Sequence, residues 1–132
     1  AVIPRFVSMI LSGDRPIIYG DGHQSRDFVF VKDVAMANRL AATVPEAAGG
    51  TFNIGRGQST TLLQLLTTLQ EILGQEIVPI HEPARAGDVR DSLADITEAR
   101  KRLRFEPEVS VTEGLRQSVD YYRSLVAPAS ST

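Results

Sequence analysis

The chain has 132 residues, a formal net charge of −2, and 42% hydrophobic against 23% charged residues, which predicts one globular domain with a core of ordinary size. The low net charge excludes a general attraction to nucleic acid or acidic membranes, and no apolar stretch is long enough to span a bilayer. Cysteine is absent, which excludes disulfides and thiolate metal sites. We expect a cytoplasmic protein, because the first residues lack a charged head followed by an apolar block.

The first third of the chain alternates between helical and extended patterns. Apolar residues at helical spacing predict a helix that starts close to the N-terminus and closes at Gly13. The apolar run 16–19 predicts a strand, and the β-forming run 27–31 predicts another after a glycine turn. Asp33 is a good N-cap for the alanine-rich helix that follows.

The middle of the chain carries the clearest local signal. The run 51–54 predicts a strand, and Thr61 with Gln64 predicts a capping box at the start of a leucine-striped helix. Gly74 is expected to end that helix, and the run 76–80 is expected to form a fourth strand.

The last third is expected to be mostly loop and helix. A polar loop spans 82–91, Asp95 and Glu98 predict a second capping box, and Thr112 is expected to cap a last helix. The alternation of strands and helices predicts the α/β class, with few short strands and about five helices. We expect one domain over 1–126 and a disordered tail over 127–132.

Two motifs resemble one enzyme family. They are Gly-Asp-Gly-x-Gln-x-Arg-Asp at 20–27 and Arg-x-Gly-Asp-x-Arg at 85–90. They are similar to the NAD-dependent nucleotide-sugar epimerases and dehydratases of the extended short-chain dehydrogenase/reductase class, and look most like UDP-glucose and UDP-N-acetylglucosamine 4-epimerases. These are Rossmann-type isomerases of carbohydrate metabolism. The resemblance covers most of this chain but only the C-terminal, substrate-binding portion of a family member.

Arg26 is the first candidate binding residue. It follows a glycine turn at the mouth of a predicted strand, and its guanidinium fork matches two phosphate oxygens and stays charged at any working pH. The resemblance implies that Arg26 binds the diphosphate of a nucleotide-sugar such as a UDP-sugar. A surface salt bridge to Asp21 or Asp27 is the alternative.

The second motif supplies further candidates. By the resemblance, Arg90 is a second phosphate clamp, Asp88 accepts hydrogen bonds from ribose hydroxyls, and Arg85 lies close to the same phosphates or ribose. The residues alone leave two other interpretations open, a solvated charged loop and a metal site at Asp88, Asp91 and Asp95. Against a metal, Asp95 is expected to cap a helix, and the arginines compete for the other carboxylates.

Weaker candidates lie near the N-terminus. The resemblance places Ala1, Val2 and Tyr19 beside the sugar and base, whereas core packing is expected for Ile3, Phe6 and Ile18. His23 and His81 are expected at the surface, because neither has a nearby serine or paired carboxylate for a catalytic triad.

Catalytic residues and a cofactor site are not expected in this chain. Gly55 and Gly57 lack the longer glycine spacing of a dinucleotide fingerprint, and none of the three tyrosines has a lysine four residues later. The resemblance therefore implies that NAD and the Tyr-x-x-x-Lys chemistry belong to an N-terminal half, as partner of this chain.

Three functions stay open on the sequence. The first is the nucleotide-sugar-binding part of an NAD-dependent UDP-sugar 4-epimerase. The second is a noncatalytic binding or interaction domain on the same scaffold, and the third is the same portion of a dehydratase or decarboxylase. Expected partners are a nucleotide-sugar and either the missing half or a second copy of the chain, because its apolar faces would otherwise be exposed.

Overall fold

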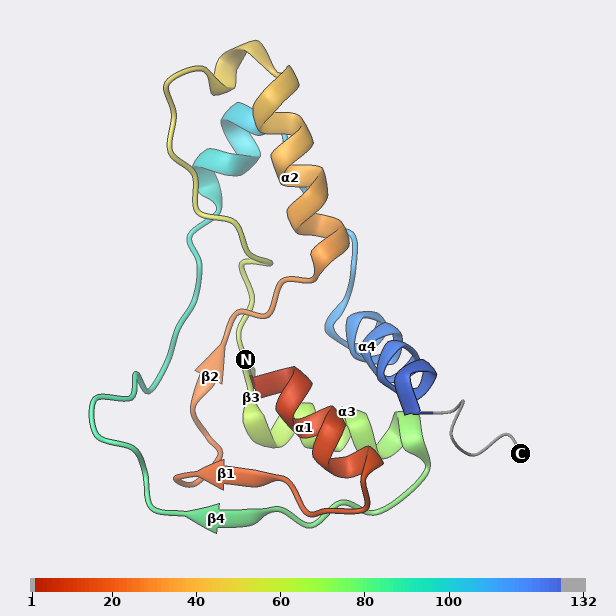
Figure 1. Ribbon diagram of the computed structural model, residues 1–132. Coiled ribbons are helices and arrows are strands. Elements are labelled where there is room, and N and C mark those ends of the chain that lie inside the picture. Colours follow the sequence, from red (N-terminus) through yellow and green to blue (C-terminus); the bar gives the residue numbers. More distant parts are fainter. Residues whose placement is uncertain (1, 127–132) are drawn as a thin grey trace. The chain divides into compact units, whose positions relative to one another are not determined.

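The computed structural model describes residues 2–126 and divides into two compact units (Figure 1). The described residues of unit 1 are 2–24, 61–88 and 112–126. Unit 2 consists of 25–60 and 89–111. Each unit is therefore assembled from segments that are distant in the sequence. The tail predicted to be disordered lies outside the described residues.

Unit 1 combines three helices with one pair of parallel strands. The helices are α1 (Val2–Leu11), α3 (Leu62–Leu73) and α4 (Val111–Val126), the last beginning at the border of unit 2. The strands β1 (Ile17–Tyr19) and β4 (Ile80–Glu82) pair in parallel and lie side by side in Figure 1. The expected first helix and first strand are confirmed.

The position predicted for the fourth strand was wrong. Instead of 76–80, β4 covers Ile80–Glu82, and Ile80 lies opposite Ile17 at the first position of β1. Pro79 has no N–H to donate to a ladder, so pairing begins at the residue after it.

Helix α3 confirms the strongest local prediction. The Thr61 hydroxyl accepts a bond of 3.1 Å from the Gln64 N–H, and the Gln64 side chain accepts one of 2.8 Å from the Thr61 N–H. Gly74 ends the helix in the left-handed conformation, with φ at +66°. Both ends of α3 are thus encoded by residues within the helix itself or next to it.

The core of unit 1 is built from one face of each helix and from β1. Phe6 and Ile18 are fully buried, as expected from the sequence, whereas Ile3, also expected in the core, is only half-buried. Their buried neighbours on the helices are the apolar stripe residues Val7, Ile10, Leu62, Leu65, Leu66, Leu69, Leu115 and Val119.

Unit 2 contains short elements and much extended chain. Its elements are β2 (Ser25–Arg26), α2 (Val31–Thr43), the 3₁₀ turn η1 (Pro45–Ala47) and the π-helical turn η2 (Ala99–Leu103), while β3 (Thr60–Thr61) lies where the chain passes to unit 1. Its core consists of Ala37, Ala47, Ile96, Ala99, Leu103 and Phe105.

The strands predicted over 27–31 and 51–54 were wrong. Residues 27–30 and 51–54 belong to no strand, and Val31 already starts α2. A strand needs a partner that supplies its ladder hydrogen bonds, and none of the described residues pairs with these two runs. Propensity alone therefore predicted the extended chain but not a sheet.

Asp33 does not cap α2. The helix begins two residues earlier, with Phe30 at the N-cap position. The Asp33 carboxylate is fully buried and accepts bonds of 3.0 and 2.9 Å from the backbone N–H groups of Glu108 and Val109. Asp33 thus ties α2 to a segment 75 residues away, a role that local sequence cannot indicate.

The second capping box was also wrong. Asp95 accepts bonds from the backbone N–H and the hydroxyl of Thr97, at 3.0 and 2.6 Å, rather than pairing with Glu98. This is an Asx turn, which reaches two residues along the chain instead of three. Helix α4 begins at Val111, so Thr112 lies inside its first turn instead of capping it.

Candidate functional site

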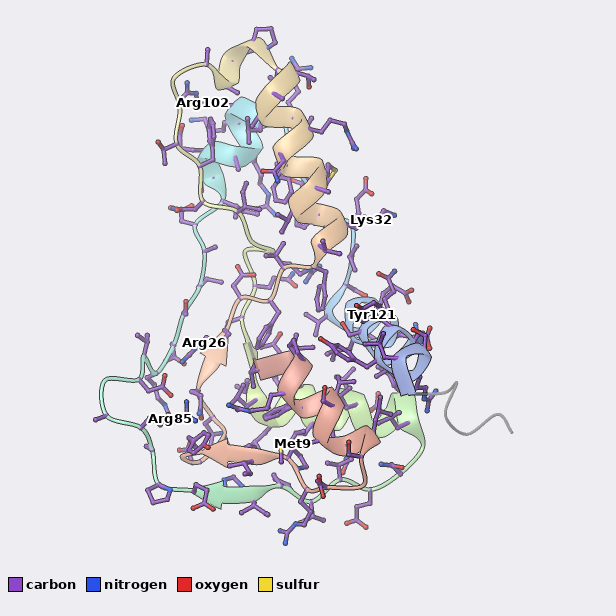
Figure 2. All side chains as sticks on the ribbon, in the orientation of Figure 1. Met9, Arg26, Lys32, Arg85, Arg102 and Tyr121 are labelled. Carbon is purple, nitrogen blue, oxygen red and sulfur yellow. The ribbon has the colours of Figure 1, made fainter. Side chains whose placement is uncertain are left out.

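Arg26 and Arg90 are brought together by backbone pairing in unit 2. The Ser25 N–H donates to the Arg90 carbonyl at 3.0 Å, and Ser92 N–H donates to the Ser25 carbonyl at 3.0 Å. Arg26 Nη1 donates to the carbonyls of Ser25 and Arg90, at 2.7 and 3.3 Å. The guanidinium of one predicted clamp residue therefore lies against the main chain of the other (Arg26 is labelled in Figure 2).

The carboxylates of the second motif serve local structure. Asp91 accepts a 2.8 Å bond from the hydroxyl of Ser25, which is almost fully buried. Hydrogen bonds from Thr97, from its hydroxyl first and its N–H second, lower the pKa of the exposed Asp95. Within residues 2–126, no three histidine, aspartate or glutamate side chains gather in a way that could hold a metal ion.

Asp27 is a structural anchor rather than a surface charge. Its carboxylate accepts bonds of 2.8 Å from the N–H groups of Arg56 and Gly57, and one of 3.3 Å from Ala94. A Cβ on Gly55 would lie 2.8 Å from Asp27 Oδ2, so only glycine lets the backbone come this close.

An open groove of about 480 Å³ lies in the same unit. Its lining is mostly polar and consists of Asp27, Asn53, Ile54, Ser92, Leu93, Ala94 and Asp95. Two of these lining residues are close in sequence to the predicted clamp residues. Asp27 directly follows Arg26, and Ser92 comes two residues after Arg90.

Tyr19 and Arg85 meet in unit 1. The guanidinium carbon of Arg85 lies 3.8 Å from the centroid of the Tyr19 ring, a cation–π contact between the end of β1 and the loop after β4. Asp88 N–H donates to the Arg85 carbonyl at 3.3 Å, in a turn that requires positive φ at Gly87. The structure thus brings together three of the predicted residues within unit 1 (Arg85 is labelled in Figure 2).

The remaining predictions near the N-terminus and at the two histidines have the following outcomes. Val2 is half-buried in the first turn of α1, and Ala1 lies outside the described residues. His23 and His81 are exposed, as expected, although the His81 ring lies 2.7 Å from the Gly20 carbonyl.

The sequence analysis missed Arg5 and Gln24. Arg5 lies on α1 with its guanidinium carbon 5.5 Å from the Tyr19 ring centroid, and the Gln24 side chain donates to the Tyr19 carbonyl at 2.8 Å. Gln24 stands inside the glycine-rich motif, so its place there was the one available signal. Arg5 lies within the segment 1–6 whose resemblance suggested Ala1 and Val2, but it was not singled out, because a single arginine on a helix usually faces solvent.

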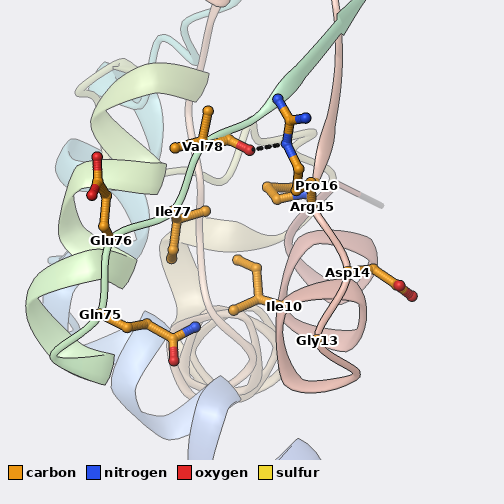
Figure 3. A pocket seen from close by; sticks show the side chains of 9 residues that line it. All are labelled: Ile10, Gly13, Asp14, Arg15, Pro16, Gln75, Glu76, Ile77 and Val78. Atoms are coloured by element: carbon orange, nitrogen blue, oxygen red, sulfur yellow. Dashed lines mark hydrogen bonds between the residues drawn. The ribbon is translucent and has the colours of Figure 1, made fainter.

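A small cavity of about 150 Å³ in unit 1 contains none of the predicted residues. Arg15 crosses its edge and donates from Nε to the Val78 carbonyl at 2.9 Å and from Nη2 to the Pro79 carbonyl at 3.0 Å. Figure 3 shows the Ile10 and Ile77 side chains facing each other across this space and the Asp14 carboxylate turned away from it. This arrangement indicates a packing gap closed by Arg15.

The fold defines the class. Its helices and few short strands match the C-terminal part of solved extended short-chain dehydrogenase/reductase epimerases. UDP-glucose 4-epimerase from Thermotoga maritima, solved with UDP-glucose, superposes with a TM-score of 0.89 at 42% identity, over 96% of this chain and 40% of that one.

The chain belongs to the family described as GDP-mannose 4,6 dehydratase, whose model matches residues 1–118. UDP-glucose 4-epimerase of Mycolicibacterium smegmatis is 37% identical over 93% of this chain and 39% of its own length. UDP-glucuronic acid 4-epimerase from Bacillus cereus, in complex with UDP-glucuronic acid and NAD, has a TM-score of 0.89 at 27% identity over 95% and 40% of the two chains. The chain thus spans about two-fifths of the length of these relatives.

Helices in the described part of the chain, residues 2–126, are too short or too polar to cross a membrane.

Proposed function

We propose that this chain is the nucleotide-sugar-binding part of an NAD-dependent UDP-sugar 4-epimerase. The observation that carries the proposal is the backbone pairing that holds the Arg26 guanidinium against Arg90, 64 residues away. Membership of a nucleotide-sugar enzyme family supports it, as do similar structures solved with UDP-sugars.

In this proposal, Arg26 and Arg90 bind the diphosphate. A guanidinium pairs with phosphate through parallel, charge-assisted hydrogen bonds. The two bonds from Nη1 to main-chain carbonyls hold the Arg26 group in one orientation before the ligand arrives, which reduces the entropy lost on binding. Two guanidinium cations on one pyrophosphate neutralise its charge and fix its orientation.

Unit 1 supplies the contacts proposed for the nucleoside. Asp88 accepts hydrogen bonds from ribose hydroxyls, Arg85 lies close to the phosphates or ribose, and Tyr19 and Val2 border the base and sugar. The stacking of Arg85 on Tyr19 supports this assignment, because it gives a long, flexible side chain a defined position.

NAD is proposed as the cofactor of the whole enzyme, where it supplies reversible hydride transfer at the sugar. The residues of this chain do not fit an NAD site, because Gly55 and Gly57 have the wrong spacing and Gly55 is packed against Asp27 and Ala94. In this proposal the chain holds the substrate, and proton transfer belongs to the Tyr-x-x-x-Lys pair of the N-terminal half. Such remote binding fixes the sugar ring near the reacting groups.

Two alternatives lead to different results. A dehydratase or decarboxylase would use the same grip on the nucleotide, and the name of the family model favours a dehydratase. A noncatalytic binding domain would keep UDP affinity in a full-length protein that converts no UDP-sugar. Product analysis with UDP-glucose and with UDP-glucuronic acid distinguishes them, because only the second sugar has a carboxylate that a decarboxylase could remove.

Titration calorimetry of UDP with the full-length protein tests whether Arg26 and Arg90 bind the diphosphate. Arg26→Ala and Arg90→Ala should each weaken UDP binding by about tenfold or more, because each removes charge-assisted hydrogen bonds. Arg100→Ala is the matched control, since this exposed arginine of unit 2 pairs with Glu106. Unchanged affinity in both variants would disprove the proposed clamp.

A further inference from the structure

Two buried polar atoms in unit 1 have no hydrogen-bond partner among the described residues. They are Nε of Arg5 and Oε1 of Gln24. Both side chains contact Tyr19, one through its ring and the other through its backbone carbonyl. Buried donors and acceptors are nearly always paired, so two unpaired atoms around one residue require an explanation.

The orientation of the Gln24 amide follows from its one bond. A carbonyl oxygen only accepts, so the amide nitrogen must face the Tyr19 carbonyl, at 2.8 Å. The Oε1 atom is then the group without a partner. Gln24 is 7% exposed, and its own carbonyl accepts a 3.2 Å bond from the Leu62 N–H, so the residue is fixed at both backbone and side chain.

Arg5 presents a donor beside the same tyrosine. Its guanidinium carbon lies 5.5 Å from the Tyr19 ring centroid and 5.6 Å from that of Phe6. Arg85 lies over the Tyr19 ring as well, and within residues 2–126 neither arginine forms an ion pair. Two cations beside one aromatic ring, one of them with an unpaired N–H, favour an acceptor group as the missing partner.

The chemistry of the two atoms limits what the ligand can be. The Oε1 atom of Gln24 needs an N–H or O–H donor, and an ionised diphosphate has none. The Nε–H of Arg5 needs an acceptor. A nucleoside offers both kinds of group, on the edge of its base and on its ribose hydroxyls, whereas the diphosphate offers only acceptors.

We propose that Arg5 and Gln24 bind the nucleoside moiety of the nucleotide-sugar, with Gln24 accepting a hydrogen bond from it and Arg5 Nε donating one. The inference rests on the proposed function and adds two binding residues to it. It explains why both atoms are unpaired without ligand. Arg15, in the same unit, shows the contrasting structural pattern, because its Nε and Nη2 are both bonded to carbonyls.

The test compares the binding of UDP and of inorganic pyrophosphate to the full-length protein by calorimetry. Arg5→Lys keeps the charge and removes Nε–H, so it should weaken UDP binding about tenfold and change pyrophosphate binding less than about twofold. Its melting temperature should change little, because Nε–H has no partner in the free protein and the lysine ammonium can keep the cation–π contacts with Phe6 and Tyr19. Arg15→Lys is the control, expected to lower the melting temperature and leave UDP affinity unchanged.

Gln24→Met is the second variant, and it should lose UDP affinity selectively in the same way. Repeating its titration with 2′-deoxy-UDP distinguishes the source of the donor. If the loss disappears, the donor is the 2′-hydroxyl; if it persists, the donor is another group of the nucleoside, and both results support the inference.

The inference is overturned if Arg5→Lys and Gln24→Met leave UDP affinity unchanged, or weaken UDP and pyrophosphate equally. The inference fails while the proposed function stands if Arg26→Ala weakens the binding of UDP and of pyrophosphate but Arg5→Lys and Gln24→Met weaken the binding of neither. It fails together with the proposed function when the unmodified protein does not bind UDP.

Discussion

Replacing Asp27 with alanine should destabilise the protein strongly, although Asp27 stands beside a predicted ligand-binding residue. The change removes the acceptor of three backbone N–H groups, two at 2.8 Å and one at 3.3 Å. Hydrogen bonds to charged groups contribute about 1.5–3 kcal/mol each, and their effects are not additive. Counting the longest bond as weak, we expect the free energy of unfolding to fall by about 3 kcal/mol.

Urea denaturation of the full-length protein, followed by circular dichroism, measures this effect. With an m value of about 2 kcal/mol per molar, the midpoint should fall by about 1.5 M. Asp95→Ala is the matched control in the same unit, because that exposed carboxylate bonds only to Thr97 and should shift the midpoint little. A midpoint for Asp27→Ala no lower than that of the control would refute the anchoring role. Asp27→Asn keeps one acceptor oxygen and should fall between the two.

Two further outcomes follow from local geometry. Gly22→Ala should lower the melting temperature clearly more than Gly13→Ala, because both glycines have positive φ but only at Gly22 would the new Cβ meet a side chain, a leucine 2.7 Å away. Equal losses would show that backbone strain alone decides. The lowered pKa of Asp95 stabilises the fold above the pKa of the unfolded chain, and this contribution is lost as the pH falls through the lower folded value. Thr97→Val removes the hydroxyl bond and should therefore raise the Asp95 pKa in an NMR titration, and an unchanged value would contradict the assigned cause.

Local signals predicted the elements that are encoded by neighbouring residues. Helix α3 has its start, stripe and stop within fourteen positions, from Thr61 to Gly74, and all three agree with the structure. The first helix and β1 were predicted from apolar spacing for the same reason. Such signals depend on contacts one helical turn away, so a single sequence contains them.

The errors involve residues whose partners are distant. Asp33 and Asp95 both have the composition of an N-cap, yet one bonds a segment 75 residues away and the other forms an Asx turn. The runs 27–31 and 51–54 have strand composition but no partner strand among the described residues. Propensity describes a preference of the backbone, whereas pairing is a tertiary event.

The candidate site shows the same limit. The resemblance implied only that Arg26 and Arg90 bind one diphosphate, and neither it nor the spacing predicted that Arg26 contacts the main chain of Arg90. Arg5 was missed altogether. A buried donor without a partner is visible only once the surrounding atoms have been placed.

The glycine-rich motif therefore has two kinds of residue. Arg26 and Gln24 are the members proposed to bind the ligand, whereas Asp27 and Ser25 hold the chain around them. Asp27 gathers three N–H groups, and Ser25 bonds both the backbone of Arg90 and the side chain of Asp91. A guanidinium on a free loop would lose much of its binding energy to the cost of ordering. The conformation of this motif thus explains how one arginine on a strand of two residues can be positioned for a diphosphate.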